Sequence, residues 1–209
     1  MKKESQVIFD KNVIEFVTVA AEFCAFLERA ESMKRSTFVD TTLKILPLLY
    51  LKASMLPKCE MIGDESPETY VTEEIYEVLR INLASILAEK DDYLEVFLPD
   101  MAYSDEPIKK NISEDLADIY QDIKDFIFVF QLGLNETMND SLAICQENFG
   151  LLWGQKLVNT MRALHDVKYS PKARGEDEEE EEYEPENNED CHCEDDDCHC
   201  HDHGCHCHD

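Results

Sequence analysis

Apolar residues recur at helical spacing through most of the first 170 positions of the chain. In residues 12–28 the positions that follow this spacing are Val13, Phe16, Val17, Ala20, Cys24 and Leu27. A second apolar set flanks them and leaves only a narrow polar strip: Ile14, Val19, Phe23 and Phe26. A helix that is apolar nearly all round is typical of the centre of a helical domain, so we expect this helix to be covered on most sides.

Two more segments continue the helical pattern. Residues 36–57 contain Pro47, which we expect to kink the helix, and Pro57, which we expect to end it. Residues 72–90 begin with Thr72, a good N-cap, and no Gly or Pro interrupts the helical pattern before residue 90. A short apolar piece, YLEVFLPDM, follows this third segment.

Residues 113–133 give the clearest amphipathic helix, which Gly133 is placed to stop. Its apolar face consists of Leu116, Ile119, Tyr120, Ile123, Phe126, Ile127 and Phe130. Its other side is marked by Asp115, Asp118, Asp122 and Asp125.

The last helical segment covers residues 137–165. Its apolar stripe begins with Met138, Leu142, Cys145, Phe149 and Leu152. Beyond Gly150 and Gly154 the stripe moves to Leu157, Met161 and Leu164, which predicts a bend there. No alternating strand pattern stands out, so the sequence predicts an all-α fold, a single bundle of about six helices.

The charge distribution divides the chain into two parts. The net charge is −28 over 209 residues, and from Glu176 to Asp209 there are seventeen Asp or Glu and no Lys or Arg. The only large apolar side chain in that stretch is Tyr183, so too little surface can be buried to offset the entropy of ordering the backbone. We therefore expect a helical domain over residues 1–170 and a disordered acidic tail over residues 171–209.

Three stretches of the helical part carry a family resemblance: FVTVAAEFCAFLE, TLKILPLLYLKASMLP and GLLWGQKLVNTMRALH. In this order and spacing they resemble the family called domain of unknown function 5063, from Bacteroides-type bacteria. The resemblance extends over about residues 5–170 and implies an all-helical cytosolic domain. It supplies no activity and no site residues, and it does not include the tail.

Composition also limits the compartment and the partners. Glu4 and Asp10 interrupt any apolar run near the start, so no secretory signal is apparent, and the longest apolar stretch, FIFVFQLGL, is far shorter than a membrane span. We expect a cytoplasmic protein whose nine cysteines stay reduced. The strong negative charge argues against binding to nucleic acid or to a membrane surface.

One carboxylate pattern is similar to the magnesium site of all-α nucleotide pyrophosphohydrolases. Glu73, Glu74 and Glu77 spell E-E-x-x-E, and Glu89 with Asp92 spells E-x-x-D. If one continuous helix holds them all, the two ends lie about 28 Å apart at 1.5 Å per residue and cannot share an ion. Exposed helix surface is the favoured interpretation, and an enzyme is the less favoured one.

The other reactive side chains of the helical part favour packing roles. His165 is its only histidine, whereas a di-iron bundle needs one histidine on each of two helices. It lies near the end of the last helix, where the negative helix terminus favours a partly protonated imidazole. Cys24, Cys59 and Cys145 are dispersed, and we expect them to pack as small apolar residues.

The tail holds the strongest chemical signal. Cys-His-Cys triplets recur every seven residues, and three further histidines lie between and after them. The candidate metal ligands are Cys191, His192, Cys193, Cys198, His199, Cys200, His201, His203, Cys205, His206, Cys207 and His208. Thiolate and imidazole suit transition-metal ions, zinc or nickel above all, and four ligands per tetrahedral ion limit the load to about three ions.

Three functional hypotheses follow. The leading one is a helical domain of unknown activity with a metal-binding tail for buffering, storage or delivery. The alternative is a protein-interaction adaptor whose tail is only a solubilising polyanion. The third, less favoured, is the magnesium-dependent pyrophosphohydrolase.

Overall fold

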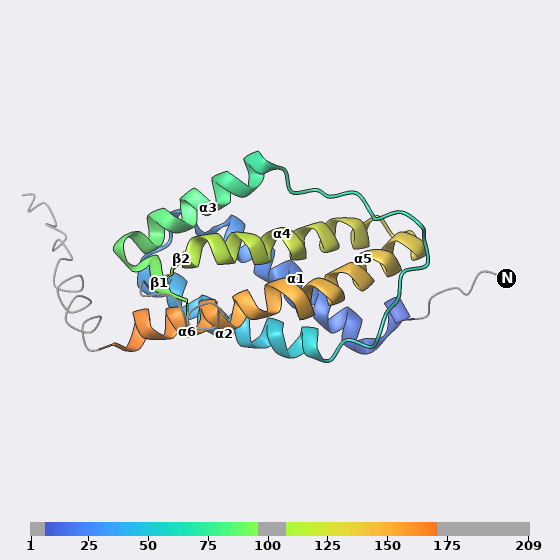
Figure 1. Cartoon of the computed structure of the whole chain (residues 1–209), viewed down its shortest axis with the longest axis horizontal. Helices are drawn as coiled ribbons and strands as arrows, with labels where there is room; N and C mark the ends of the chain where they lie inside the picture. Colours follow the sequence, from blue (N-terminus) through green and yellow to red (C-terminus); the bar gives the residue numbers. More distant parts are fainter. Residues whose placement is uncertain (1–6, 96–107, 171–209) are drawn as a thin grey trace, which may run out of the picture.

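The computed structural model describes residues 7–95 and 108–170, and the tail predicted at residues 171–209 lies outside them. Helices dominate the described residues, in which the all-α fold is confirmed (Figure 1). The α-helices are α1 (Lys11–Glu28), α2 (Arg35–Ser54), α3 (Glu73–Leu87), α4 (Ile112–Gln131), α5 (Asn135–Asn148) and α6 (Gly154–Tyr169). The shorter elements are the turns η1 (Val7–Phe9), η2 (Ala30–Ser32), η3 (Ala88–Lys90) and η5 (Phe149–Trp153), with strands β1 (Asp92–Leu94) and β2 (Lys109–Asn111).

Helix α1 is the central helix that its apolar pattern predicted. It packs against α2, α3 and α4, and most of its apolar side chains are buried. Phe16 lies at the middle of the core, with ring centroids 5.5 Å from Phe126 of α4 and 6.5 Å from Trp153 of η5. Asp10 caps the helix by accepting a 2.8 Å hydrogen bond from the backbone N–H of Asn12.

Helix α2 begins and ends close to the predicted residues, and α3 begins close to its predicted start. Pro47 lies inside α2, which continues to Ser54. The Thr72 hydroxyl accepts a 3.3 Å hydrogen bond from the backbone N–H of Ile75, which confirms the predicted N-cap of α3. The prediction of a helix as far as residue 90 is wrong, because Ala88 adopts a positive φ of 47° that ends α3 one residue earlier.

A two-stranded hairpin precedes α4, where no strand was predicted. Strands β1 and β2 form an antiparallel ladder of three residue pairs, too short for an alternating pattern to be visible in the sequence. The Asp91 carboxylate accepts hydrogen bonds from the backbone N–H of Ser113 (2.7 Å) and from its hydroxyl (2.6 Å). Asp91, which precedes the hairpin, thus provides an acceptor for a backbone N–H in the first turn of α4, where such groups have no partner within the helix.

Helix α4 contacts α1, α3, α5 and α6, so both of its sides face protein. The predicted apolar face is buried along its whole length, as expected. The aspartate side is not a solvated face: Asp115 is only 4% exposed, and Asp118, Asp122 and Asp125 are partly buried. Gly133, with a φ of 74°, allows the turn that folds α5 back along α4.

The π-helical turn η5 lies where a bend between α5 and α6 was predicted. The backbone N–H of Gly154 bonds the carbonyl of Phe149, five residues earlier, so the turn inserts one extra residue into the helical repeat. The core position predicted for Leu152 is therefore taken by Trp153, which is fully buried, while Leu152 is 53% exposed. The indole N–H of Trp153 donates a 3.1 Å hydrogen bond to the carbonyl of Cys145.

Candidate functional site: an acidic pocket between α4 and α5

A long connecting segment, residues 55–72, runs from the end of α2 to the start of α3 past α5 (Figure 1). Side chains of α5 hold its first half. Gln146 accepts a 3.0 Å hydrogen bond from the backbone N–H of Cys59 and donates to the carbonyls of Leu56 (3.2 Å) and Pro57 (3.1 Å). One amide side chain thus supplies hydrogen-bond partners to backbone N–H and C=O groups that are not paired within a helix or strand.

Two carboxylates, one from α5 and one from α4, anchor the rest of the connecting segment. Asp140 of α5 accepts hydrogen bonds from the backbone N–H groups of Ile62 (2.7 Å) and Gly63 (2.9 Å). A Cβ atom at Gly63 would lie 2.7 Å from Asp140 Oδ2, so a larger residue there would displace this carboxylate. Asp125 of α4 accepts from the backbone N–H groups of Tyr70 (2.6 Å) and Val71 (2.8 Å).

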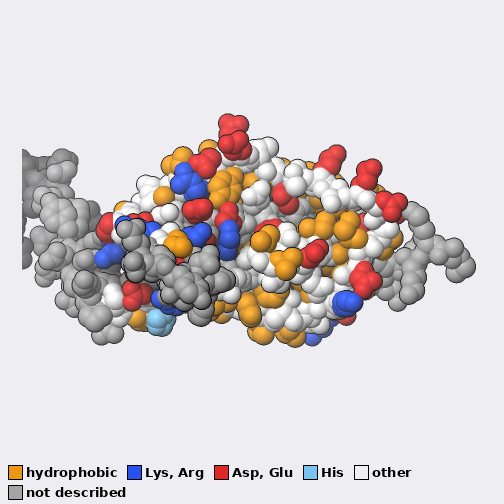
Figure 2. Space-filling view, in the orientation of Figure 1, with side chains coloured by type: hydrophobic (Ala, Val, Ile, Leu, Met, Phe, Trp, Pro, Cys, Tyr) orange, Lys and Arg blue, Asp and Glu red, His pale blue; other side chains and the backbone are white. Residues whose placement is uncertain are grey.

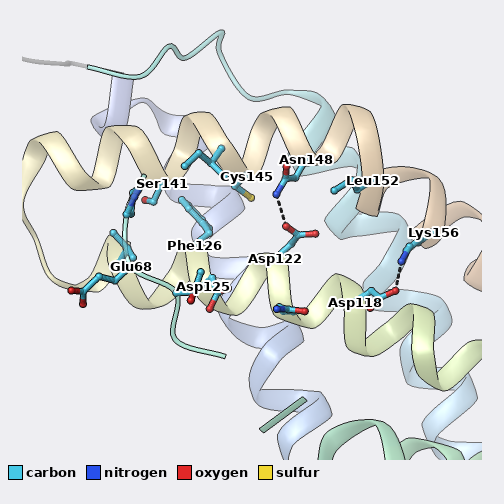
Figure 3. Close-up of a pocket in the computed structure, with 15 residues that line it drawn as sticks. Glu68, Asp118, Asp122, Asp125, Phe126, Ser141, Cys145, Asn148, Leu152 and Lys156 are labelled. Carbon is cyan, nitrogen blue, oxygen red and sulfur yellow. Dashed lines mark hydrogen bonds and ion pairs between the residues drawn. The ribbon is translucent and has the colours of Figure 1, made fainter. Parts of the chain in front are cut away.

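The connecting segment, α4, α5, η5 and the start of α6 together line an open pocket of about 420 Å³ (Figure 3). Its acidic lining residues are Glu68, Asp118, Asp122 and Asp125, and the one basic residue is Lys156. The apolar lining comes mainly from Phe126, Val129, Ile144 and Leu152. On the face drawn in Figure 2, apolar and acidic side chains are intermixed, and Lys and Arg side chains lie mainly in its left half.

The aspartates of the pocket differ in their partners. Asp118 pairs with the ammonium group of Lys156 and accepts a 2.8 Å hydrogen bond from the Tyr76 hydroxyl. Asp122 accepts a 2.6 Å hydrogen bond from the side-chain amide of Asn148 (Figure 3). Burial raises the pKa of Asp122 and that of Asp125, although the hydrogen bonds that each accepts act in the opposite direction.

A second set of buried polar groups lies beside the hairpin. The Tyr93 hydroxyl donates to Asp115, whose pKa is raised by burial, and Asn159 donates to Glu95 at 3.2 Å. These groups satisfy one another, which is the usual condition for polar side chains in a core. We therefore assign them a structural role.

The carboxylates of the pyrophosphohydrolase pattern do not come together. Glu77 pairs with Arg80 at 2.7 Å near the start of α3, whereas Glu89 pairs with Arg35 at 2.5 Å beyond its end. The two parts of the pattern are separated by most of the length of α3, about 20 Å at 1.5 Å per residue. In the part of the chain that the structure describes, no three His, Cys, Asp or Glu side chains are grouped to hold a metal ion.

The cysteines of the helical domain pack as predicted. Cys24 and Cys145 are buried, and the half-buried Cys59 thiol donates to the Asn139 carbonyl at 3.4 Å. Burial raises the pKa of all three thiols, so each stays protonated. His165 is exposed near the end of α6, with its ring 4.6 Å from that of Tyr169. The twelve Cys and His residues predicted as metal ligands lie outside the described residues.

Comparison with known proteins identifies the family. The model of the family described as domain of unknown function, DUF5063, matches residues 7–170, and the chain belongs to this family. Among solved structures, the chain is similar to protein BF1032 from Bacteroides fragilis, a structural genomics target. That match has 93% sequence identity and a TM-score of 0.73, and it covers 81% of this chain and 99% of the other.

No curated protein matches the chain. None of the described helices is both long enough and apolar enough to cross a membrane. The pocket was missed from the sequence alone, although its aspartates recur at helical spacing on one side of α4. That pattern is shared with exposed helix surfaces, so it does not by itself indicate a pocket.

Proposed function

We propose that this protein handles transition-metal ions, zinc or nickel above all, through the acidic tail that follows its helical domain. The observation that carries the proposal is the repeat of Cys-His-Cys triplets at residues 191–193, 198–200 and 205–207. Two cysteines one residue apart are strained as a disulfide, but their thiolates can bind one ion together. The seventeen acidic residues of this region attract cations to it.

The chemistry of the helical domain supports placing the metal at the tail. A thiol must lose its proton to bind metal, and burial raises the pKa of Cys24, Cys59 and Cys145. These three cysteines are therefore poor ligands as the domain is folded. We infer a buffering, storage or delivery role in the reducing environment of the cytoplasm, with metal ions rather than nucleic acid or membrane as the partner.

The experiment is a competitive titration of Zn²⁺ or Ni²⁺ against a chromophoric chelator under reducing conditions. It compares the full-length parent with a variant that has all six tail cysteines replaced by serine. Cys59→Ser serves as the matched control, because it removes a thiol from the helical domain. We expect the six-serine variant to lose most high-affinity binding and the control to bind like the parent.

The affinity should also fall with pH. Metal ions displace protons from thiols and compete with protons for imidazole, so binding weakens as the pH falls through the range in which histidine protonates. If the parent and the six-serine variant compete equally poorly at neutral pH, the metal proposal is wrong and the tail acts only as a polyanion.

A second candidate function is a protein-interaction adaptor. It is favoured by the π-helical turn, where the adjacent residues Leu151 and Leu152 are 70% and 53% exposed, since adjoining exposed apolar side chains can form part of a contact patch. In an adaptor of this kind, the double variant Leu151→Ser with Leu152→Ser should keep the fold and lose partner binding. The six-serine tail variant should keep partner binding.

A further inference from the structure

An open pocket lies beside the contact between α4 and α5, where packed helix pairs normally leave little space. Asp122, Ser141 and Asn148 occupy positions that face the partner helix, and their small or polar side chains leave the pocket of about 420 Å³. This volume lies within the range of about 300–1,000 Å³ that is usual for small-molecule sites. Apolar side chains form part of the wall, so the cavity can desolvate a ligand as well as attract it.

The charge of the lining indicates a cationic ligand. Four carboxylates line the pocket against a single ammonium group, that of Lys156, which pairs with Asp118. Among the described residues, no Lys or Arg forms an ion pair with Asp122 or Asp125. An entering cation would thus offset the charge of two partly buried carboxylates, each destabilised by desolvation.

The arrangement of the carboxylates favours an elongated cation over a metal ion. Asp118 and Asp125 are seven residues apart on α4, about 10 Å along the helix axis, so the charges follow the pocket wall and do not converge on a point. Apolar side chains line the pocket beside them, namely Phe126, Ile144 and Leu152. Such a lining matches positive groups joined by methylene groups.

The protein itself places one alkylammonium group against a carboxylate of this pocket. Lys156 is an alkylammonium side chain that lines the pocket and ends on Asp118 (Figure 3). Lys156 belongs to α6 and occupies the end of the pocket formed by that helix. The remaining length, beside Asp122 and Asp125, has the same combination of carboxylate and apolar wall.

We propose that this pocket binds a linear aliphatic ammonium compound, with an ammonium group at Asp122 and Asp125 and its alkyl chain against Phe126 and Leu152. This site is separate from the metal chemistry of the tail. Binding requires ionised carboxylates, so the affinity falls as the pH is lowered through the raised pKa of Asp122. The same alkylammonium chemistry is offered by a free polyamine and by a lysine side chain of a partner protein.

The experiment uses the full-length protein and residue-resolved NMR, with 1,5-diaminopentane as the probe and pentane-1,5-diol as the uncharged control. We expect the diamine, but not the diol, to shift the resonances of Asp122, Ser141 and Asn148 in a saturable way. The acidic tail attracts the same probe, and because the readout is local to each residue, the two effects are separated.

Two variants with a matched control assign the site. Asp122→Asn keeps the shape and a hydrogen-bonding group toward Asn148, and we expect it to weaken diamine binding at the pocket at least tenfold. Asp166→Asn removes the same charge from an exposed position of α6 and should leave the affinity unchanged. Leu152→Lys, at an exposed rim position, adds a competing cation and should weaken binding without disturbing the core.

The outcomes show whether the ammonium group comes from a free polyamine or from a lysine side chain, and whether the proposal is correct. Binding of the diamine alone identifies a free polyamine, and tighter binding of Nα-acetyl-lysine methylamide identifies a lysine side chain of a partner. If neither compound shifts the pocket resonances, or if Asp166→Asn weakens binding as much as Asp122→Asn, the proposal is wrong. Displacement of the diamine by an equal concentration of Mg²⁺ would also refute an elongated-cation site.

Discussion

Gly150 within the turn η5 and Gly154 directly after it should respond in opposite ways to the same substitution. At Gly154 a Cβ atom would lie 2.3 Å from the carbonyl oxygen of Phe149 and 2.9 Å from its ring, because the π-helical turn brings that carbonyl to the Gly154 N–H. At Gly150, four residues earlier, a Cβ atom would meet nothing within 4 Å. Gly154→Ala and Gly150→Ala therefore form a matched pair that tests the turn itself.

The magnitudes follow from these contacts. In an ordinary helix Gly→Ala stabilises by up to about 1 kcal/mol, and we expect that gain for Gly150→Ala. A contact of 2.3 Å with a backbone atom cannot be relieved by a side-chain rotation, so Gly154→Ala must shift the backbone, at a cost of about 1–3 kcal/mol as in other overpacked sites. For a domain of this size, 1 kcal/mol corresponds to about 2–4 °C in Tm.

Urea and thermal unfolding of both variants, followed by helical circular dichroism, measure the difference. Trp153 is the only tryptophan and lies directly beside Gly154, so its fluorescence reports on the same turn. We expect a lower Tm and an altered native-state emission for Gly154→Ala, and a Tm equal to or above that of the parent for Gly150→Ala. Equal stabilisation by both substitutions would show that residues 149–154 form a regular α-helix, and the explanation for the burial of Trp153 would then be wrong.

Two further predictions concern the connecting segment and the pocket. Asp140→Asn leaves one oxygen to accept the hydrogen bonds from the backbone N–H groups of Ile62 and Gly63. It should lower the free energy of unfolding in urea by about 1–3 kcal/mol and speed proteolysis of the connecting segment. Unchanged proteolysis would contradict this anchoring role. Asp122→Asn should raise Tm at pH 7. Because burial raises the pKa of Asp122 in the folded state, its contribution to stability is full below the ordinary Asp range and is lost as the pH rises through the folded pKa. The gain in Tm should therefore shrink as the pH is lowered from 7 toward the ordinary Asp range, and a gain that does not change with pH would contradict the raised pKa of Asp122.

Much of the fold could be predicted because the helices carry their pattern locally. The nearly continuous apolar surface of α1 identified it as central, since only a covered helix can bury side chains on most sides. The apolar face of α4 and the cap at Thr72 could also be read from neighbouring residues, because helical spacing and capping depend on positions three or four residues apart. The resemblance to the DUF5063 family is likewise confirmed by the match over residues 7–170.

The features that build the pocket depend on contacts between distant residues. Asn139, Asp140 and Gln146 look like ordinary polar helix positions, yet they hold backbone groups about 80–90 residues earlier in the chain. The aspartate side of α4 became a pocket wall only because α5 and the connecting segment cover it. The sequence by itself thus determined which segments are helical and which face of each is apolar. Only the tertiary structure decided which polar side faces solvent and which encloses a cavity, because that depends on the packing partner and not on the helical repeat.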